Sequence, residues 1–222
     1  MYSNGVSETI LGKAIKQFNL PRGEIAVMTK HIFDSVKQSL ERLQLDYIDV
    51  LQCHRFDHET PIAETMQALH DVVKLGLVRY IGMSSCWAYQ FHAMQNYALA
   101  NNLTPFISMQ NLYNLLYREE EREMMPTLKM FGVGCIPWSP LARGYLSRPY
   151  ESSFPPSDAT AAEPSFGSED KGKTSRQETD KFASFYQTAP KQTIDRVEEL
   201  AKKKNVPMSQ IALAWLLSKE GM

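Results

Sequence analysis

The sequence has no long apolar run, almost no net charge and few cysteines. No stretch approaches the roughly 20 apolar residues that a membrane-spanning helix needs, and residues 2–5 (YSNG) lack the basic and apolar regions of a signal peptide. The net charge is −1, and no stripe of lysine and arginine stands out. A nucleic-acid groove or a membrane surface is therefore not expected as a partner.

Cysteines are few and scattered. The three, Cys53, Cys86 and Cys135, lie far apart, each in or beside an apolar segment. An odd number without metal-type spacing argues against a disulfide framework and against a zinc site. We therefore expect buried thiols in a reducing cytoplasm, and no metal.

The 222 residues, 43% of them hydrophobic, are enough for one sizeable core, so a single domain over residues 1–222 is expected. Apolar periodicity predicts short strands at residues 24–29, 47–53, 78–83, 106–109 and 132–137. It predicts helices at residues 7–18, 31–43, about 60–76, about 87–100, about 119–130, 193–204 and 209–219. Residues from about 146 to 190 are rich in Ser, Pro and charge without a sustained period, which favours a flexible loop.

Strands that alternate with helices indicate parallel β/α units. The predicted strands are short and apolar on both faces, which is typical of strands covered outside by helices and inside by other side chains. The favoured fold is an α/β protein of the (β/α)8 barrel type, of which five of the eight strands are recognisable. A doubly wound open sheet is the alternative, but no G-x-G-x-x-G turn follows any strand.

Polar or aromatic residues follow each predicted strand, at the end where β/α barrels carry their reactive groups. In chain order they are Lys30; His54 and Arg55; Ser84 and Ser85; Gln110 and Asn111; and Trp138 and Ser139. Singly, such residues are usually a solvated charge, a structural histidine or a packed ring. Five strand ends that direct such groups into one mouth indicate a ligand site.

Four segments, in order, carry a resemblance to a known family. They are residues 2–12 (YSNGVSETILG), 46–54 (DYIDVLQCH), 79–85 (RYIGMSS) and 138–144 (WSPLARG). Together they resemble the aldo-keto reductase family, most closely its microbial and fungal aryl-alcohol-dehydrogenase-like branch. The resemblance covers nearly the whole chain outside residues 146–190. It implies an oxidoreductase that transfers a hydride between NADP(H) and an aldehyde, ketone or alcohol.

The resemblance also implies catalytic roles. Tyr2 matches the family's proton-donating tyrosine, Lys30 the lysine that lowers the tyrosine pKa, and His54 the histidine that orients the substrate carbonyl. The chemistry agrees, because a phenol has a pKa near 10 and a nearby ammonium favours the phenolate. A neutral imidazole can hydrogen-bond the carbonyl oxygen, while the cofactor delivers the hydride.

The cofactor-binding residues follow from the same resemblance. Ser84 and Ser85 match a Ser-Asn pair that holds the nicotinamide carboxamide, with Ser in place of the usual Asn, and Gln110 matches a glutamine that contacts the same group. Trp138 takes the place of the aromatic residue that stacks on the nicotinamide ring. The loop around the pyrophosphate matches Ser139, Pro140, Leu141, Arg143 and Gly144.

The sequence departs from the family pattern in three places. Two strands and an aspartate that pairs with the lysine would precede Tyr2, a longer loop would follow Lys30, and a final strand with the site for the adenosine 2′-phosphate would follow Met222. Lacking strands one, two and eight, the barrel would have open edges, so we expect self-association through them. A non-catalytic remnant or partner subunit of the family is one alternative function. Another barrel enzyme that binds phosphate on its late loops is a second.

Overall fold

The computed structural model describes residues 5–18, 28–29, 32–153 and 190–222, which belong to two compact units. The first unit comprises Met1–Asn111, Glu121–Ile136 and Gly221. The second comprises Leu112–Glu120, Pro137–Glu220 and Met222. Tyr2, Lys30, and most of the predicted strand at 24–29 and of the predicted loop at 146–190 lie outside the described residues.

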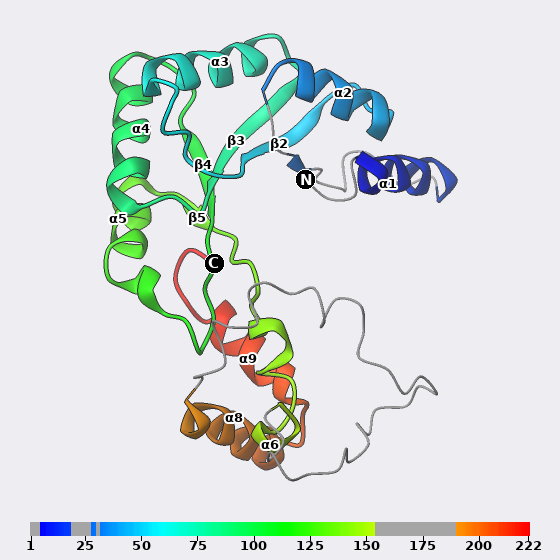
Figure 1. The fold of residues 1–222 in the computed structure, drawn as a ribbon, viewed down its shortest axis with the longest axis vertical. Coiled ribbons are helices and arrows are strands. Elements are labelled where there is room, and N and C mark those ends of the chain that lie inside the picture. Colours follow the sequence, from blue (N-terminus) through cyan, green and yellow to red (C-terminus); the bar gives the residue numbers. More distant parts are fainter. Residues whose placement is uncertain (1–4, 19–27, 30–31, 154–189) are drawn as a thin grey trace. The chain divides into compact units, whose positions relative to one another are not determined.

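A parallel sheet forms the centre of the first unit (Figure 1). Its strands lie in sequence order: β1 (Met28–Thr29), β2 (Ile48–Cys53), β3 (Val78–Ser84), β4 (Phe106–Gln110) and β5 (Gly134–Cys135). Every neighbouring pair is parallel, so the carboxyl ends of all five strands lie at one edge of the sheet. The alternation of strands and helices predicted from the sequence is confirmed in this unit.

Helices alternate with the strands of this unit along the chain. They are α1 (Val6–Gln17), α2 (Asp34–Leu43), α3 (Ile62–Lys74), α4 (Ala88–Ala100) and α5 (Met124–Phe131). Figure 1 shows α3, α4 and α5 following one another along one side of the sheet. Their apolar stripes supply fully buried side chains such as Met66, Leu69 and Phe91, which join Ile81 and Phe106 of the strands in the core. Burial of this apolar surface is the main favourable contribution to folding of the unit.

A row of small and polar residues crosses the sheet beneath its carboxyl edge. Gln52, Gly82 and Ser108 are register partners on β2, β3 and β4. Gln52 is 1% exposed; its side-chain amide donates to the Met83 carbonyl and its Oε1 accepts a bond from the Ser108 hydroxyl at 3.5 Å. A Cβ at Gly82 would lie 2.4 Å from both Gln52 Oε1 and Ser108 Oγ. Glycine is therefore required there to make room for the glutamine.

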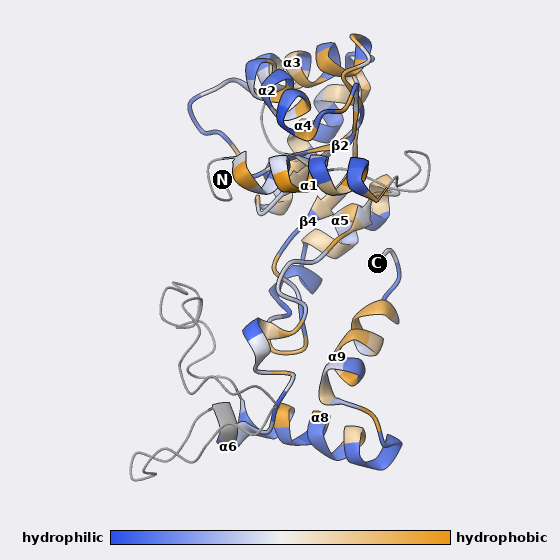
Figure 2. Ribbon diagram, turned by 90° about the vertical axis from the view of Figure 1, so that its right-hand side faces the viewer, coloured by the Kyte–Doolittle hydropathy of each residue, from blue (hydrophilic) through white to orange (hydrophobic). Residues whose placement is uncertain are grey.

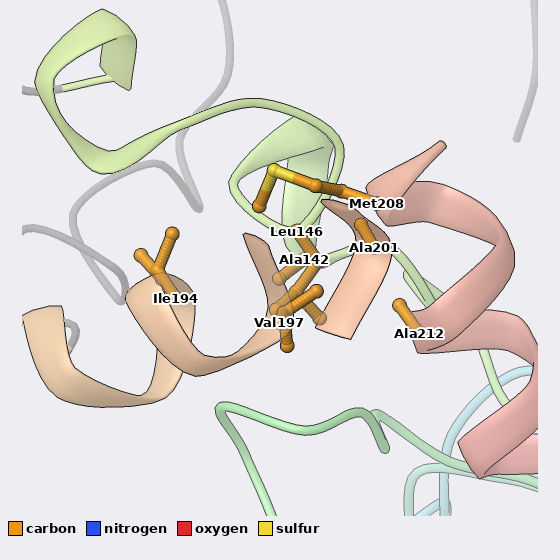
Figure 3. Close-up of a cluster of buried hydrophobic side chains, with 7 residues drawn as sticks. All are labelled: Ala142, Leu146, Ile194, Val197, Ala201, Met208 and Ala212. Carbon is orange, nitrogen blue, oxygen red and sulfur yellow. The ribbon is translucent and has the colours of Figure 1, made fainter. Parts of the chain in front are cut away.

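The second unit is helical in its described part. It contains a 3₁₀ turn η4 (Ala142–Gly144), the single helical turn α6 (Tyr150–Ser153), α8 (Lys191–Lys204) and α9 (Met208–Leu217). Figure 2 shows that α8 is mostly hydrophilic whereas α9 is mostly hydrophobic. Their apolar faces meet in a buried cluster, drawn in Figure 3, whose members are Ala142, Leu146, Ile194, Val197, Ala201, Met208 and Ala212. Leu146 is thus a core residue, although the sequence places it in the flexible segment.

The largest departure from the predicted elements concerns the helix expected at about residues 119–130. A 3₁₀ turn, η3 (Glu119–Glu121), comes first, and α5 begins only at Met124. Pro126 explains the later start, because proline is tolerated in the first turn of a helix but breaks its interior. Gly132, in the left-handed region with φ +66°, ends the helix. The last predicted strand is shorter than expected and covers only Gly134–Cys135.

Gly82→Ala should lower the free energy of unfolding by about 1–3 kcal/mol, because the added methyl forces Gln52 or Ser108 from its place. Gly134→Ala in β5 is the matched control, since the nearest atom to its Cβ would lie at 3.8 Å. That variant should change stability by less than about 1 kcal/mol. Urea unfolding monitored by circular dichroism measures the stability of both variants. Equal stability of the two would contradict the claim that glycine is required at position 82.

Candidate active site

Three adjacent strand ends of the first unit carry the predicted site residues. Register pairs Cys53 with Met83 and Ser84 with Gln110, so the ends of β2, β3 and β4 lie side by side. His54 follows β2, whereas Ser84 and Gln110 are the last residues of β3 and β4. The structure therefore brings His54, Ser84, Ser85 and Gln110 to one edge of one sheet.

The turn after β3 is tied to both neighbouring strand ends. The Ser84 hydroxyl donates to the Gln110 carbonyl at 2.6 Å, and the Ser85 N–H donates to Asn111 Oδ1 at 2.7 Å. On the other side, Arg55 Nη1 donates to the Ser85 carbonyl at 3.2 Å. Ser85 has a φ of +51°, in the left-handed region that non-glycine residues rarely adopt. Contacts from β2 and β4 thus hold the turn in a disfavoured conformation.

The loop between β2 and α3 is ordered by its own polar contacts. Asp57 accepts hydrogen bonds from the Thr60 hydroxyl at 2.7 Å and the Glu59 N–H at 2.9 Å. These bonds favour the carboxylate and so hold the pKa of Asp57 below its ordinary value; the bond from Thr60 has the larger effect. The loop also holds the exposed His54, whose imidazole is the predicted group for orienting the substrate.

Aromatic rings of the β2–α3 loop lie close to rings of the segment that follows β3. Phe56 and His58 from the β2–α3 loop are 5.1 Å apart between ring centroids, and His58 reaches Trp87 at the start of α4 at 6.5 Å. Trp87 in turn lies 5.6 Å from Tyr89. Trp87 and Tyr89 are each more than 60% exposed, so ring surface faces solvent close to the strand ends.

The other predicted cofactor residues belong to the second unit. Trp138 forms an isolated parallel β-bridge with Leu112. The Ser139 carbonyl accepts hydrogen bonds from Asn114 Nδ2 and the Ala142 N–H, both at 2.9 Å. The turn that follows is strongly curved. Its left-handed residues are Ser139 (φ +52°), Ala142 (+49°), Arg143 (+58°) and Gly144 (+98°). A loop of this kind beside an arginine suits a phosphate group.

Each unit therefore brings together its own share of the predicted residues. His54, Ser84, Ser85 and Gln110 lie in the first unit, while Trp138, Ser139, Pro140, Leu141, Arg143 and Gly144 lie in the second. The sequence placed Arg55 and Asn111 among the polar groups at the strand ends without a specific role, and it did not single out Asn114. The side chains of all three hold these turns. The available signal was that asparagine often bonds turn backbones, but this does not say which backbone group it meets.

Three further findings concern the described residues. No group of three or more His, Cys, Asp or Glu among them is arranged to hold a metal, and none of their helices is long and apolar enough to cross a membrane. Cys86 and Cys135 are buried and Cys53 is half-buried, and no disulfide links them. The expectation of buried thiols is thus confirmed for Cys86 and Cys135.

Comparison with known proteins identifies the class. The sequence model of the aldo/keto reductase family matches residues 1–222. An aldo-keto reductase of Fusarium vanettenii is 43% identical over 97% of this chain, and versiconal hemiacetal acetate reductase of Aspergillus parasiticus is 43% identical over 98%. A putative aryl-alcohol dehydrogenase of Schizosaccharomyces pombe is 40% identical over 99%. The chain belongs to the aldo/keto reductase family, whose fold is a (β/α)8 barrel.

The chain matches only part of the length of each relative. The chain spans 65% of the Fusarium protein, 69% of the Aspergillus reductase and 74% of the Schizosaccharomyces protein. The alignment with the Fusarium protein extends over 259 positions, more than the 222 residues of the chain itself. That relative therefore has residues within the matched region that have no counterpart here.

The pKa of Asp57 gives a pH-dependent prediction. Because this pKa is lower in the folded chain, the carboxylate adds stability above its unfolded pKa of about 3.9, and this contribution is lost as pH falls through the folded pKa. Thr60→Val should raise the Asp57 pKa toward its ordinary value, measured by NMR titration of the carboxyl carbon. Thr127→Val, which removes a hydroxyl bonded to the Glu123 carbonyl, is the control and should leave it unchanged. An unaltered Asp57 pKa in the Thr60 variant would contradict the assignment.

Proposed function

We propose that the chain transfers a hydride between NADP(H) and an aldehyde, ketone or alcohol. The observation that carries this proposal is the meeting of His54, the Ser84–Ser85 turn and Gln110 at the adjacent ends of β2, β3 and β4. Membership of the aldo/keto reductase family supports an oxidoreductase of this kind. One barrel domain over residues 1–222 and a cytoplasmic location complete the proposal.

Three side chains would carry the acid–base chemistry. Tyr2 donates the proton that the substrate oxygen gains on reduction, and Lys30 lowers the Tyr2 pKa because its ammonium favours the phenolate. His54 follows β2 and is exposed, so its imidazole is accessible to hydrogen-bond a substrate oxygen. In alcohol oxidation the same groups act in reverse, and Tyr2 accepts the proton.

The described residues fit a nicotinamide nucleotide, which supplies the hydride when bound. In the first unit, Ser84, Ser85 and Gln110 place two hydroxyls and one amide at neighbouring strand ends, the donors and acceptors that a carboxamide needs. In the second unit, Trp138 offers a ring for stacking, and Arg143 a guanidinium for the pyrophosphate. Both side chains belong to one short segment, residues 138–144.

Aromatic carbonyl compounds are the proposed substrates, with a role in secondary metabolism. Two relatives carry names that fit, one for a reductase of versiconal hemiacetal acetate and one for a putative aryl-alcohol dehydrogenase. The exposed rings of Trp87 and Tyr89 come after the end of β3, the neighbour of the strand end that precedes His54, and add apolar surface suited to planar compounds.

Self-association through sheet edges is also proposed, because β1 and β5 are the outer strands of the described sheet. The β5 edge is partly paired, since the Cys135 N–H donates to the Gly221 carbonyl at 2.7 Å. Because unpaired outer strands can pair with another chain, sedimentation velocity should show concentration-dependent oligomers. A monomer over the whole micromolar range would contradict this proposal.

The activity is tested by following NADPH consumption with a panel of aromatic aldehydes. The unaltered chain should oxidise NADPH, and Tyr2→Phe should slow the reaction by about 10²–10⁴-fold, the usual loss for an acid catalyst. Tyr80→Phe, which removes an exposed phenol on β3, is the control and should have no effect. Full activity of the Tyr2 variant would remove Tyr2 from its role. NADPH binding without turnover by the unaltered chain would instead favour a non-catalytic member of the family.

A further inference from the structure

Both predicted cofactor turns contain a serine in the left-handed conformation. Ser85 follows β3 in the first unit, with φ +51°, and Ser139 follows Trp138 in the second, with φ +52°. Serine does not favour this region, so surrounding contacts must hold each backbone there. The contacts come from two asparagines of the segment that follows β4, Asn111 in the first unit and Asn114 in the second.

Asn111 holds Ser85 as a hydrogen-bond acceptor. Its Oδ1 receives the Ser85 N–H at 2.7 Å, and the residue is 1% exposed. Because the side chain is buried away from solvent, this bond is costly to lose. Serine tolerates the left-handed region less well than glycine or asparagine. Asn111 thus stabilises a conformation that the residue at position 85 does not favour by itself.

Asn114 holds Ser139 as a donor. Its Oδ1 accepts the backbone N–H groups of Leu116 at 2.9 Å and Tyr117 at 3.0 Å. These two donors fix which end of the amide is oxygen, so Nδ2 is directed at the Ser139 carbonyl, 2.9 Å away. The residue is 0% exposed. The side chain therefore links its own turn to the turn that carries Trp138 and Arg143.

We propose that Asn111 and Asn114 are positioning residues for nicotinamide nucleotide binding. Asn111 sets the backbone of the carboxamide-binding turn at Ser84–Ser85, and Asn114 sets the backbone of the turn at residues 138–144. The inference rests on the proposed function. Neither asparagine needs to touch the cofactor, since each acts through the serine backbone that it holds.

The opposite polarity of the two bonds makes one substitution informative at both positions. Asn111→Asp keeps an oxygen to accept the Ser85 N–H. Asn114→Asp keeps the acceptor for Leu116 and Tyr117 but replaces the donor to Ser139 with a second oxygen, which faces a carbonyl. The same chemical change should therefore preserve the bond to the Ser85 N–H at position 111 and abolish the bond to the Ser139 carbonyl at position 114.

Gln95 provides the control for general loss of a buried amide. It is 3% exposed, and its side chain pairs with the Phe106 N–H and carbonyl, at the opposite end of β4 from the site. Gln95→Leu should lower the melting temperature without changing NADPH affinity. Asn111→Leu is its counterpart at the site.

The experiment combines NADPH titration with hydrogen exchange of the cofactor-free chain. Asn111→Leu should speed hydrogen exchange of the Ser85 amide. Asn114→Asp should speed exchange of the Ala142 amide, which donates to the Ser139 carbonyl. Both should weaken NADPH binding by about tenfold, the equivalent of one lost hydrogen bond. Asn111→Asp should retain slow exchange at Ser85 and bind NADPH more tightly than Asn111→Leu.

Two outcomes would overturn the inference. One is NADPH affinity in Asn111→Leu and Asn114→Asp equal to that of Gln95→Leu, and the other is unchanged exchange at Ser85 and Ala142. Failure of the proposed function has a different signature, since the unaltered chain itself would not bind NADPH. The exchange measurements need no cofactor and would still report whether the two serine turns are held by the asparagines.

Discussion

Hydrogen bonds between the ends of three parallel strands determine where the functional groups of the first unit lie. Arg55 reaches the Ser85 carbonyl from β2, and Asn111 accepts the Ser85 N–H from β4, so the turn between them has little freedom. Just below, Gln52 and Ser108 meet over Gly82, and this close fit fixes the register of the same three strands. A slip in that register would separate His54 from Ser84 and Gln110.

In the second unit a buried asparagine holds a different loop in the same way. Asn114 fixes the Ser139 carbonyl. The tryptophan expected to meet a cofactor, Trp138, directly precedes Ser139, and the arginine, Arg143, lies in the curved turn that follows it. In both units a buried amide holds the backbone of a turn at a half-buried serine, Ser85 or Ser139. Polar ligands are generally bound in this way, by loops whose conformation is set before the ligand arrives.

Much of the fold could be predicted because apolar periodicity reports which face of each element is buried. The strand ends, and so His54, Ser84 and Gln110, followed from the strand assignments. The predicted start of α5 was wrong, although Pro126 marked it, because the charged residues 118–123 upstream of the proline are also good helix formers. The roles of Asn111 and Asn114 could not be predicted, since they depend on left-handed backbone at residues distant in sequence.

Family membership and strand-end geometry support one central proposal, that this chain moves a hydride between a nicotinamide cofactor and a carbonyl carbon. The most direct test uses NADPH that carries deuterium at the transferred position, with an aromatic aldehyde as acceptor and mass spectrometry of the product. The account predicts an alcohol with one deuterium on the former carbonyl carbon. Recovery of the aldehyde alone, or of alcohol without deuterium, would contradict it.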